Sequence, residues 1–397
     1  MKKILFLGAS GSQISPIQYS KSKGYFIITV DNVPENPGHK LSDEYINLSI
    51  TEKKDILQIC LDRNIDAVIG YASDLAASTQ AYISSNSKLI GPPLIATEIL
   101  INKIRFREYL KENNLQRIFF KRFFQNEVHK LKDVISSLPR SRYIIKPVDS
   151  AGSKGVYIFN KNDFDVTKAE ESFNFSNKKE IILEEFLEKK SPQICGDGFI
   201  FKNKIIFIDF GDGHFHDFES SPVPFGETFG GSLSKNLYKK IELKIQEILS
   251  NIEYEGPFNF DVFWLGGNNF FINEIGPRSG GNFIPNVIGL RNQFDFIGTL
   301  VEYYLGALPE FPKMYSSDLF YASYMIHSKQ EMIYSNISIH PELLNKIHSQ
   351  RLFIQKGTKV NKFKSGNHSV GNIIFEFSTF EEMNETYKNI YNLIKIC

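Results

Sequence analysis

The sequence is poor in cysteine. Only Cys60, Cys195 and Cys397 occur among its 397 residues, far apart and with no CxxC pair. This excludes a disulfide framework of the kind that holds small secreted proteins together, and it excludes a cysteine-based zinc motif. Because so few cysteines suit a reducing compartment, we expect the protein to be cytoplasmic.

The sequence also lacks a charge bias and long apolar runs. Its 46 basic and 45 acidic residues nearly cancel, so it has no general electrostatic attraction for nucleic acid or for an anionic membrane. The start, MKKILFLGASG, has too few apolar residues for a signal peptide, and no run reaches the ~18 apolar residues of a membrane span. We expect a soluble protein, with neither nucleic acid nor membrane as a partner.

The length of the chain exceeds what one hydrophobic core supports, so two to four domains are expected. Residues 1–95 predict a doubly wound parallel sheet in which short apolar strands alternate with helices. The expected strands cover 3–7, 25–30, 67–70 and 88–90, and the expected helices cover 15–24, 53–63 and 74–85.

A glycine-rich turn follows the first expected strand. Gly8 and Gly11, together with Asp31 at the end of the second strand, are consistent with a dinucleotide site in which the acid holds a ribose. The GxGxxG spacing is not satisfied, however, because the next glycine is Gly24. The sequence therefore disfavours a dinucleotide site here.

Further along, a strand, a glycine-rich loop and a second strand follow a helix expected at 96–113. The first strand, 143–145, leads to Lys146, and the loop 149–155 reads DSAGSKG. Such a loop can cover phosphates while a lysine on the adjoining strand neutralises their charge, although a plain hairpin turn is also glycine-rich. It is not a Walker loop, because no GK[ST] opens a helix. Lys103 lies on the preceding helix, where a lysine is ordinarily exposed to solvent.

Acidic residues interrupt an apolar strand expected at 180–183. The interruption reads Glu184, Glu185, Phe186, Leu187. It is either the end of a strand that reaches solvent or a hinge whose backbone edge pairs with an adenine.

The segment 211–232 shows neither helical nor strand periodicity, and we expect a long loop that faces a substrate. It contains His214, His216, Asp217 and Glu219. An HxH pair without a well-spaced third ligand is a weak zinc signal, so the roles of both histidines stay open.

The stretch 258–278 predicts a hairpin with a turn at Gly267. In that register Leu265 faces Phe270 and Asp261 faces Glu274. Opposed carboxylates destabilise a sheet, so a cation, a shared proton or a shifted register must relieve them. Mg²⁺ is the simplest solution, and two ordinary solvated acids are the alternative.

The remainder predicts a helix at 237–252, a helix at 294–305 and a small α+β lobe after residue 310. Expected strands of the lobe cover 320–326, 352–355 and 373–377. A capping box of Ser378 and Glu381 opens a last helix.

In this order the parts resemble the ATP-grasp superfamily, and most of all its carboxylate–amine ligases, which include the L-amino acid ligases. The motifs are Lys103, IIKPVDSAGSKGV, ILEEFLE, the hairpin acids and NEIGPRSGG. The resemblance implies a mixed α/β and α+β fold with four parts. These are a parallel α/β domain at 1–95, ATP-binding subdomains at 96–187 and 188–310, and a small α+β lobe at 311–397.

The resemblance also implies roles for individual residues. Lys103 and Lys146 match lysines that contact ATP phosphates, and Asp261 and Glu274 match carboxylates that hold Mg²⁺, with Mn²⁺ as an alternative. Arg278 matches an arginine beside the transferred phosphate and acyl group, which makes Arg278 and Lys146 the catalytic candidates. The matches to the nucleotide-binding loop and the adenine hinge are Ser150, Gly152, Ser153, Gly155, Glu184, Glu185, Phe186 and Leu187.

Two positions depart from the pattern. Gly276 stands where many members place an asparagine that also binds the metal, which leaves the third protein ligand open. Ser191 or Gln193 falls where a ribose-binding acid is common.

The implied activity is ATP-dependent ligation of a small carboxylate to an amine through an acyl phosphate, with release of ADP and phosphate. Two alternatives remain. One is a bicarbonate-activating carboxylase of the biotin carboxylase or purine-pathway type, and the other is a non-catalytic nucleotide-binding regulatory module. A homodimer is also left open.

Overall fold

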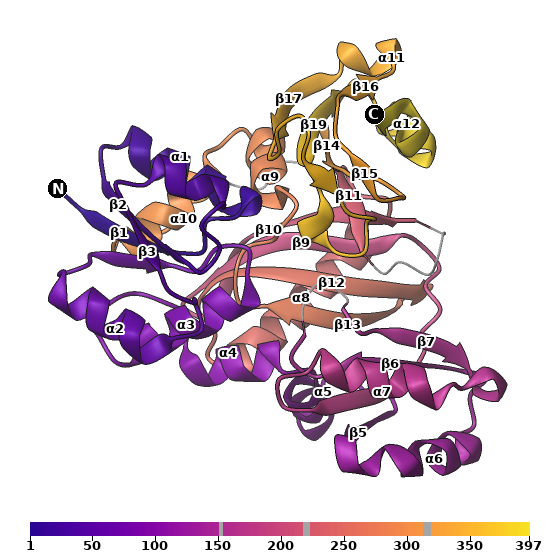
Figure 1. Ribbon diagram of the computed structural model, residues 1–397. Coiled ribbons are helices and arrows are strands. Elements are labelled where there is room, and N and C mark those ends of the chain that lie inside the picture. Colours follow the sequence, from indigo (N-terminus) through magenta and orange to yellow (C-terminus); the bar gives the residue numbers. More distant parts are fainter. Residues whose placement is uncertain (151–153, 217–222, 313–318) are drawn as a thin grey trace.

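A four-stranded parallel sheet forms the core of the N-terminal lobe (Figure 1). The computed structural model describes residues 1–150, 154–216, 223–312 and 319–397. The sheet has the order β3-β2-β1-β4. Its strands are β1 (Lys3–Leu7), β2 (Phe26–Asp31), β3 (Glu44–Asn47) and β4 (Ala67–Ile69), and its helices are α1 (Ile14–Ser22), α2 (Lys53–Asp62) and α3 (Asp74–Ser85). The expected layout is confirmed, but β3 was not predicted, and the strand expected at 88–90 is wrong because these residues form none.

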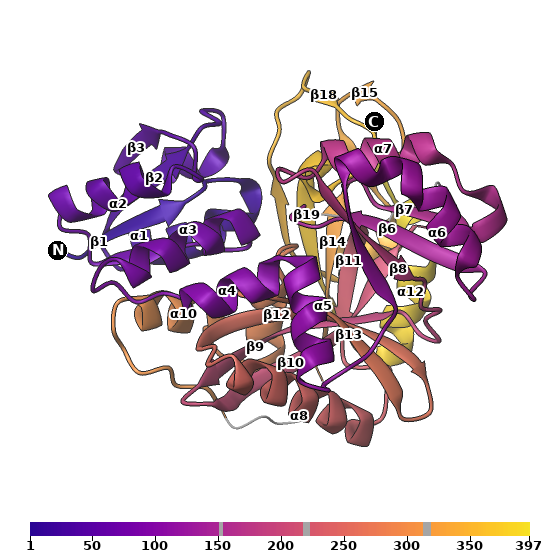
Figure 2. The ribbon, with the colours of Figure 1, turned by 90° about the horizontal axis from the view of Figure 1, so that it is seen from below.

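Helices cover both faces of this sheet. Leu5 and Val30 pack toward Ile56 of α2, while alternate residues such as Ile4 pack toward Ile17 of α1. The second face is completed by α10 (Phe296–Tyr304), which is distant in sequence but lies beside α1 in both views (Figures 1 and 2). The N-terminal lobe is therefore fixed to the body of the molecule by shared apolar packing.

Two helices, not the single one expected at 96–113, lead out of the lobe. They are α4 (Leu94–Ile101) and α5 (Lys103–Glu112). The helix breaks at Asn102, whose side-chain oxygen accepts hydrogen bonds from the N–H groups of Ile104 and Arg105, each at 3.0 Å. Such a cap satisfies N–H groups that have no partner within the helix. Lys103 thereby becomes the first residue of α5.

A four-stranded antiparallel sheet with the order β5-β8-β6-β7 follows. Its strands are β5 (Phe120–Phe124), β6 (Arg142–Pro147), β7 (Tyr157–Asn160) and β8 (Glu180–Glu185), and its helices are α6 (Leu131–Ser137) and α7 (Val166–Asn174). Tyr143 and Ile145 pack toward the two helices. Because side chains alternate along a strand, Lys146 projects from the other face.

An eight-stranded sheet runs through the rest of the molecule in the order β13-β12-β9-β10-β11-β14-β19-β17. Residues 188–310 contribute β9 (Gln193–Phe201), β10 (Lys204–Phe215), β11 (Pro224–Phe229), β12 (Gly256–Gly266) and β13 (Asn269–Gly276). Residues 311–397 contribute β14 (Phe320–Ile326), β17 (Ile347–Leu352) and β19 (Gly371–Phe377). One sheet thus spans both regions, and the four-domain division stays a prediction.

The expectation of an irregular loop at 211–232 is wrong for residues 211–215 and 224–229, which form strands, while residues 230–232 are irregular as expected. Residues up to 215 extend β10, and β11 begins at residue 224. Gly211 and Gly213 occupy alternate positions in β10, so the usual apolar alternation of a strand is missing from the sequence.

Helices cover the large sheet, with α8 (Lys235–Asn251) packing on Ile208 and Phe260 and α9 (Ile284–Asn292) packing on Phe229. The C-terminal region adds α11 (Pro341–Leu344), α12 (Phe380–Leu393), β15 (Met332–Ile333), β16 (Ile337–Ile339), β18 (Lys359–Val360) and β20 (Ile394–Ile396). None of the helices in the described parts of the chain is long and apolar enough to cross a bilayer.

Two expectations about the C-terminal region are wrong. The strand expected at 352–355 is displaced, since β17 ends at Leu352. The last helix is capped by Thr379, whose hydroxyl accepts the N–H of Glu382 at 3.1 Å, and not by Ser378.

Candidate active site

The hairpin of β12 and β13 brings two carboxylates together. Asp261 pairs with Glu274 as expected, but Phe270 pairs with Trp264 and not with Leu265. The pairing shifts after Asp261 and again near the turn. Because the two shifts have opposite senses and cancel, Asp261 and Glu274 remain opposite each other.

A cavity of about 1200 Å³ lies between the N-terminal lobe, the four-stranded sheet and the large sheet. Among the residues expected in the site, those that line it are Lys103, Lys146, Ser150, Glu184, Glu185, Phe186, Leu187, Gln193, Asp261, Glu274 and Arg278. Gly155 is not among the lining residues, and Gly152 and Ser153 lie outside the described residues. The structure thus collects in one cavity residues that are up to 175 positions apart in the chain.

One wall of the cavity contains a buried ion network. Glu184, 1% exposed, accepts hydrogen bonds at 2.6 Å from Arg107 Nε and from Lys146 Nζ. Arg107 also donates to the backbone oxygen of Asn273 at 2.9 Å, which links α5 to β13. Burial alone raises the pKa of Glu184, but the two cations outweigh it and lower that pKa to about 2.

The ion network determines which groups of the expected adenine hinge, residues 184–187, could contact a purine. Both oxygens of Glu184 are already hydrogen-bonded, and Glu185 accepts from the N–H of Phe119 at 3.0 Å. The two side chains are therefore engaged within the protein, and a purine at this edge would be read by the backbone. Nearby Ile144 and Phe271 line the same cavity and offer apolar surface for such a ring.

Two lysines, Lys103 and Lys146, line the cavity. Lys146 is held by Glu184, and Lys103 Nζ donates to the backbone oxygen of Ser150 at 2.8 Å. The backbone N–H of Lys103 also donates to Val148 at 3.1 Å. Lys103 is thus tied to the segment that leads into the glycine-rich loop.

The carboxylate pair differs in that no ion pair between described residues includes Asp261 or Glu274. Arg278 and Lys189 act to lower the pKa of Asp261 through their charge, but burial and Glu274 outweigh them. Gln193 hydrogen-bonds to Asp261, so its side chain lies at the carboxylate pair, and its predicted ribose contact stays a prediction. Burial raises the pKa of Asp261 to about 6, and Glu274 adds to the rise. A bound cation would stabilise both ionised groups.

These residues fit a metal that binds together with a nucleotide. The described residues contain no group of three or more His, Cys, Asp or Glu side chains that could hold a metal ion. Mg²⁺ commonly takes one or two protein carboxylates and completes its shell with phosphates and water. Asp261 and Glu274 would supply that pair.

Arg278 reaches the N-terminal lobe. Its Nε donates to Asp74 at the start of α3 at 2.8 Å. A Cβ at position 276 would lie 3.2 Å from the guanidinium carbon of Arg278, a close contact. Gly276, the departure noted in the sequence, therefore gives this side chain room beside the backbone.

The glycine-rich turn after β1 lines the same cavity and is held by hydrogen bonds within the protein. Asp31 accepts hydrogen bonds from Ala9 N–H at 3.0 Å and from Asn36 Nδ2 at 2.7 Å. Gln13 fills the turn, and its amide oxygen would clash with a Cβ on Gly8. Asp31 thus stabilises the turn.

The two histidines are bound to neighbours within the fold. His214 Nε2 lies 2.9 Å from Thr228 Oγ1, and His216 Nε2 lies 2.6 Å from Nε2 of His327. Burial lowers the pKa of His214 to about 4 and that of His216 to about 3. Asp217 and Glu219 lie outside the described residues.

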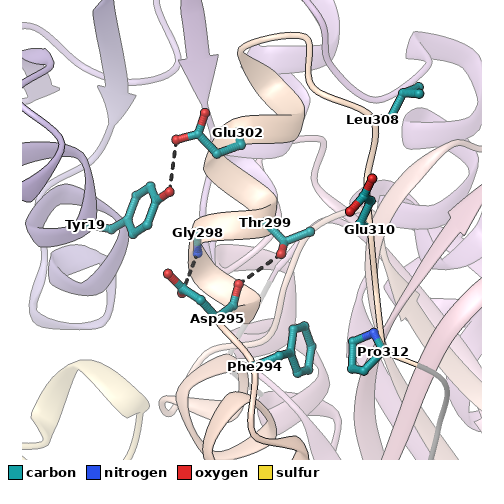
Figure 3. Close-up of a pocket in the computed structure, with 9 residues that line it drawn as sticks. All are labelled: Tyr19, Phe294, Asp295, Gly298, Thr299, Glu302, Leu308, Glu310 and Pro312. Carbon is teal, nitrogen blue, oxygen red and sulfur yellow. Dashed lines mark hydrogen bonds between the residues drawn. The ribbon is translucent and has the colours of Figure 1, made fainter.

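A second, smaller cavity of about 320 Å³ is lined by Tyr19 of α1, by residues 294–302 at and within α10, and by Leu308, Glu310 and Pro312 (Figure 3). Tyr19 points across it to Glu302 and donates a hydrogen bond of 3.0 Å. It contains none of the residues expected in the site.

Sequence reasoning missed Arg107, Asp74 and Glu227. A signal for Arg107 was present, since it stands three residues from both Ile104 and Leu110, on the apolar face of the expected helix. Asp74 and Glu227 carried no signal, because their partners are distant in the chain.

No known protein family matches the sequence, and no curated protein matches it either. Solved structures do match, and they cover the whole chain. An L-amino acid ligase from Bacillus licheniformis is 15% identical with a TM-score of 0.82 and matches over 100% of this chain and 98% of its own. A phosphoribosylglycinamide synthetase from Anaerococcus prevotii is 20% identical with a TM-score of 0.78, and the match covers 100% of this chain and 99% of that protein's chain.

A third structure is the biotin carboxylase domain of a 2-oxoglutarate carboxylase from Hydrogenobacter thermophilus. It is 14% identical with a TM-score of 0.77, over 100% of this chain and 90% of its own, and it is a dimer in complex with MgADP, ADP and bicarbonate. At these identities the match shows the fold. The chain has the ATP-grasp fold, as the sequence motifs indicated.

Proposed function

We propose that the chain is an ATP-dependent carboxylate–amine ligase that forms an amide or peptide bond through an acyl phosphate. The observation that carries the proposal is one cavity lined by two lysines, an arginine and two opposed carboxylates that form no ion pair with any described residue. The similarity to an L-amino acid ligase and to a phosphoribosylglycinamide synthetase supports it.

Each group has a part in this reaction. Lys103 and Lys146 bind the phosphates of ATP and screen their charge, so that a substrate carboxylate can approach the γ-phosphorus in line. Mg²⁺ held by Asp261 and Glu274, with Mn²⁺ as an alternative, supplies further neutralisation when bound. Arg278 binds the anionic acyl phosphate. The amine then attacks the acyl carbon, a C–N bond forms and phosphate leaves.

We also propose that the protein is cytoplasmic and that it can form a homodimer. The three cysteines form no disulfide, and Cys60 and Cys195 are buried, which supports a cytoplasmic protein. A homodimer is included because the matched biotin carboxylase domain is a dimer, and light scattering of the purified protein would measure it.

The test is ADP release from Mg-ATP across a panel of carboxylates and amines. We expect ADP only when a particular carboxylate is present, and product amide when an amine is added. Bicarbonate serves as a further arm. If bicarbonate alone supported ADP release, the protein would be a carboxylase and not a ligase. If ATP bound but no carboxylate, amine or bicarbonate supported ADP release, the protein would be a non-catalytic regulatory module.

A further inference from the structure

An ion pair in the large cavity joins the N-terminal lobe to the large sheet. Nε of Arg278, just after β13, donates to Oδ1 of Asp74, the first residue of α3, at 2.8 Å. Both residues line the cavity, and their side chains are only 14% and 13% exposed. The two residues are 204 positions apart in the chain. The arginine proposed to bind the acyl phosphate is therefore held by a side chain of another lobe.

The contact uses part of the hydrogen-bonding capacity of Arg278. A guanidinium has five N–H donors in one rigid plane. The Nε donor is bound to Asp74, and one donor of Nη1 is bound to the backbone oxygen of Ser279 at 3.2 Å. The guanidinium forms no other hydrogen bond with the parts of the chain that the structure describes. With two of the five donors bound, three remain for an anionic ligand, and the contact with Asp74 helps to fix their directions because the group is planar.

Asp74 is also the carboxylate that Arg278 contacts, although others attract it. Burial lowers the pKa of the guanidinium, but the charge of Asp74 and the hydrogen bond to it outweigh burial, and the pKa is raised. Glu274 and Asp197 also raise this pKa through their charges. Among the described residues, however, the ion pair of Arg278 is with Asp74. Glu274, one of the two proposed metal ligands, thereby stays available for a cation.

The turn between β4 and α3 fixes the position of Asp74. Ala72 has a left-handed φ of 54°, which is uncommon for residues other than glycine, and such strain is concentrated at functional sites. Gly70 packs closely on the first turn of α3, because a Cβ on it would lie 2.7 Å from the carbonyl carbon of Ala76. Ser73 caps the helix, since its hydroxyl accepts the N–H of Ala76 at 3.3 Å. Asp74 thus projects from a closely packed helix start, where the helix dipole also favours its negative charge.

The backbone that carries Arg278 is held by a different acid. The N–H of Gly280 donates to both oxygens of Asp197, at 3.0 and 2.8 Å, and Asn259 Nδ2 donates to Oδ1 of Asp197 at 2.8 Å. Asp197 is fully buried. This contact fixes the main chain two residues after Arg278, whereas Asp74 binds the end of its side chain. The backbone and the guanidinium of Arg278 are therefore held from two different lobes.

We propose that Asp74 is a positioning residue of the ligase, which holds the guanidinium of Arg278 in the orientation that binds the acyl phosphate. This inference rests on the proposed function and adds a residue of the N-terminal lobe to it. An arginine that is already oriented loses little rotamer freedom when its ligand binds, and preset donors stabilise the charge that develops on the transferred phosphate. Without Asp74 the side chain must be ordered during the reaction, and the chemical step becomes slower.

The test measures hydroxamate formation, in which hydroxylamine attacks the acyl carbon, a C–N bond forms and phosphate leaves. The protein is incubated with Mg-ATP, hydroxylamine and one carboxylate at a time, from a panel of acetate, succinate, benzoate and the standard amino acids. With a carboxylate that the wild type activates, we expect Asp74→Asn to lower kcat about 10- to 100-fold, the range for a lost hydrogen bond to a charged group. Asp74→Glu, which keeps the charge, should recover part of this loss.

Two further measurements separate positioning from a structural role. The affinity for MgADP, measured by calorimetry, should stay that of the wild type in Asp74→Asn, because ADP lacks the transferred phosphate. Arg278→Gln and the double variant complete a cycle, and if Asp74 acts through Arg278, the double variant should be no slower than Arg278→Gln alone. Asp55→Asn, which removes an exposed acid from the first turn of α2, is the matched control and should leave kcat unchanged.

The outcomes separate the positioning role from the ligase activity. A wild-type kcat in Asp74→Asn, or losses from Asp74→Asn and Arg278→Gln that add in the double variant, would overturn the positioning role and leave the ligase standing. Weakened binding of MgADP by Asp74→Asn would also overturn it, because Asp74 would then serve the nucleotide or the fold. No hydroxamate from any carboxylate with the wild type would remove the ligase and the inference together.

Discussion

Glu184 of β8 and Glu227 of β11 are both buried carboxylates on the walls of one cavity, and their surroundings are opposite. Glu184 contacts two cations, and its pKa falls to about 2. Glu227 contacts an amide and a hydroxyl, and its pKa rises to about 7. The four-stranded sheet therefore neutralises its buried charge within the protein. The large sheet keeps negative charge, part of which a bound metal is expected to neutralise.

The largest effect on the free energy of unfolding is expected at Glu184, whose charge is neutralised by Arg107 and Lys146. Glu184→Gln leaves Arg107 and Lys146 buried without a counter-charge, and breaking a buried ion network by removing one partner costs about 3–5 kcal/mol. We expect the free energy of unfolding, measured by urea denaturation, to fall by about this amount. Glu381→Gln is the exposed control. Unchanged stability of Glu184→Gln would show that the network does not hold the two sheets together.

The same kind of substitution at the carboxylate pair should act in the opposite sense on stability. Asp261→Asn removes a buried charge that faces Glu274, so we expect the ligand-free protein to gain roughly 1–2 kcal/mol. Turnover of Mg-ATP should fall by at least about 100-fold because a metal ligand is lost. The paired measurements are urea denaturation without ligand and ADP release. Near-normal turnover in Mg²⁺ would contradict the metal assignment.

The pH dependence of stability should also differ between the carboxylates of the large sheet and Glu184 of the four-stranded sheet. The pKa values of Asp261 and Glu227 are raised in the folded protein, so these two groups bind more protons in the folded state than in the unfolded state between about pH 4.5 and pH 7. Their contribution to stability without ligand should therefore fall as pH rises through this window, by roughly 2 kcal/mol. The buried histidines His214 and His216, whose pKa values are lowered, contribute the opposite slope, so the contribution of Asp261 is measured as the difference between the wild type and Asp261→Asn. Glu184, with its lowered pKa, contributes the opposite slope only below about pH 4.5.

Mg-ATP should reduce this loss, because bound metal stabilises the ionised form of Asp261. Melting temperatures recorded from about pH 5 to pH 8, with and without Mg-ATP, test it. A slope that Mg-ATP leaves unchanged would mean that the raised carboxylates lie away from the metal.

The smallest effect is expected far from both walls. Thr379→Ala removes the cap of α12 and should lower the free energy of unfolding by about 1 kcal/mol. ADP release should not change. A change in turnover would show that the C-terminal helix influences the site, and the comparison of the two walls would then be incomplete.

The difference between the walls explains what the sequence could predict. Lys146 and the Asp261–Glu274 pair were predictable, because both depend on local strand alternation and on one hairpin register. The pairing of Glu184 with Arg107 joins residues 77 positions apart, and no local pattern encodes such a contact. The strands around Gly211 and Gly213 were missed for a related reason, since residues that leave a cavity open do not show the apolar period of a packed strand.

The central claim is that the γ-phosphate of ATP is transferred to the substrate's own carboxylate. The direct measurement uses a carboxylate substrate labelled with ¹⁸O in its carboxyl group, turned over with Mg-ATP and an amine, followed by mass spectrometry of the released phosphate. An acyl phosphate requires one labelled oxygen to leave with the phosphate, and we predict that result. Unlabelled phosphate from a productive turnover would mean that water or another group attacked ATP, and it would contradict the ligase assignment.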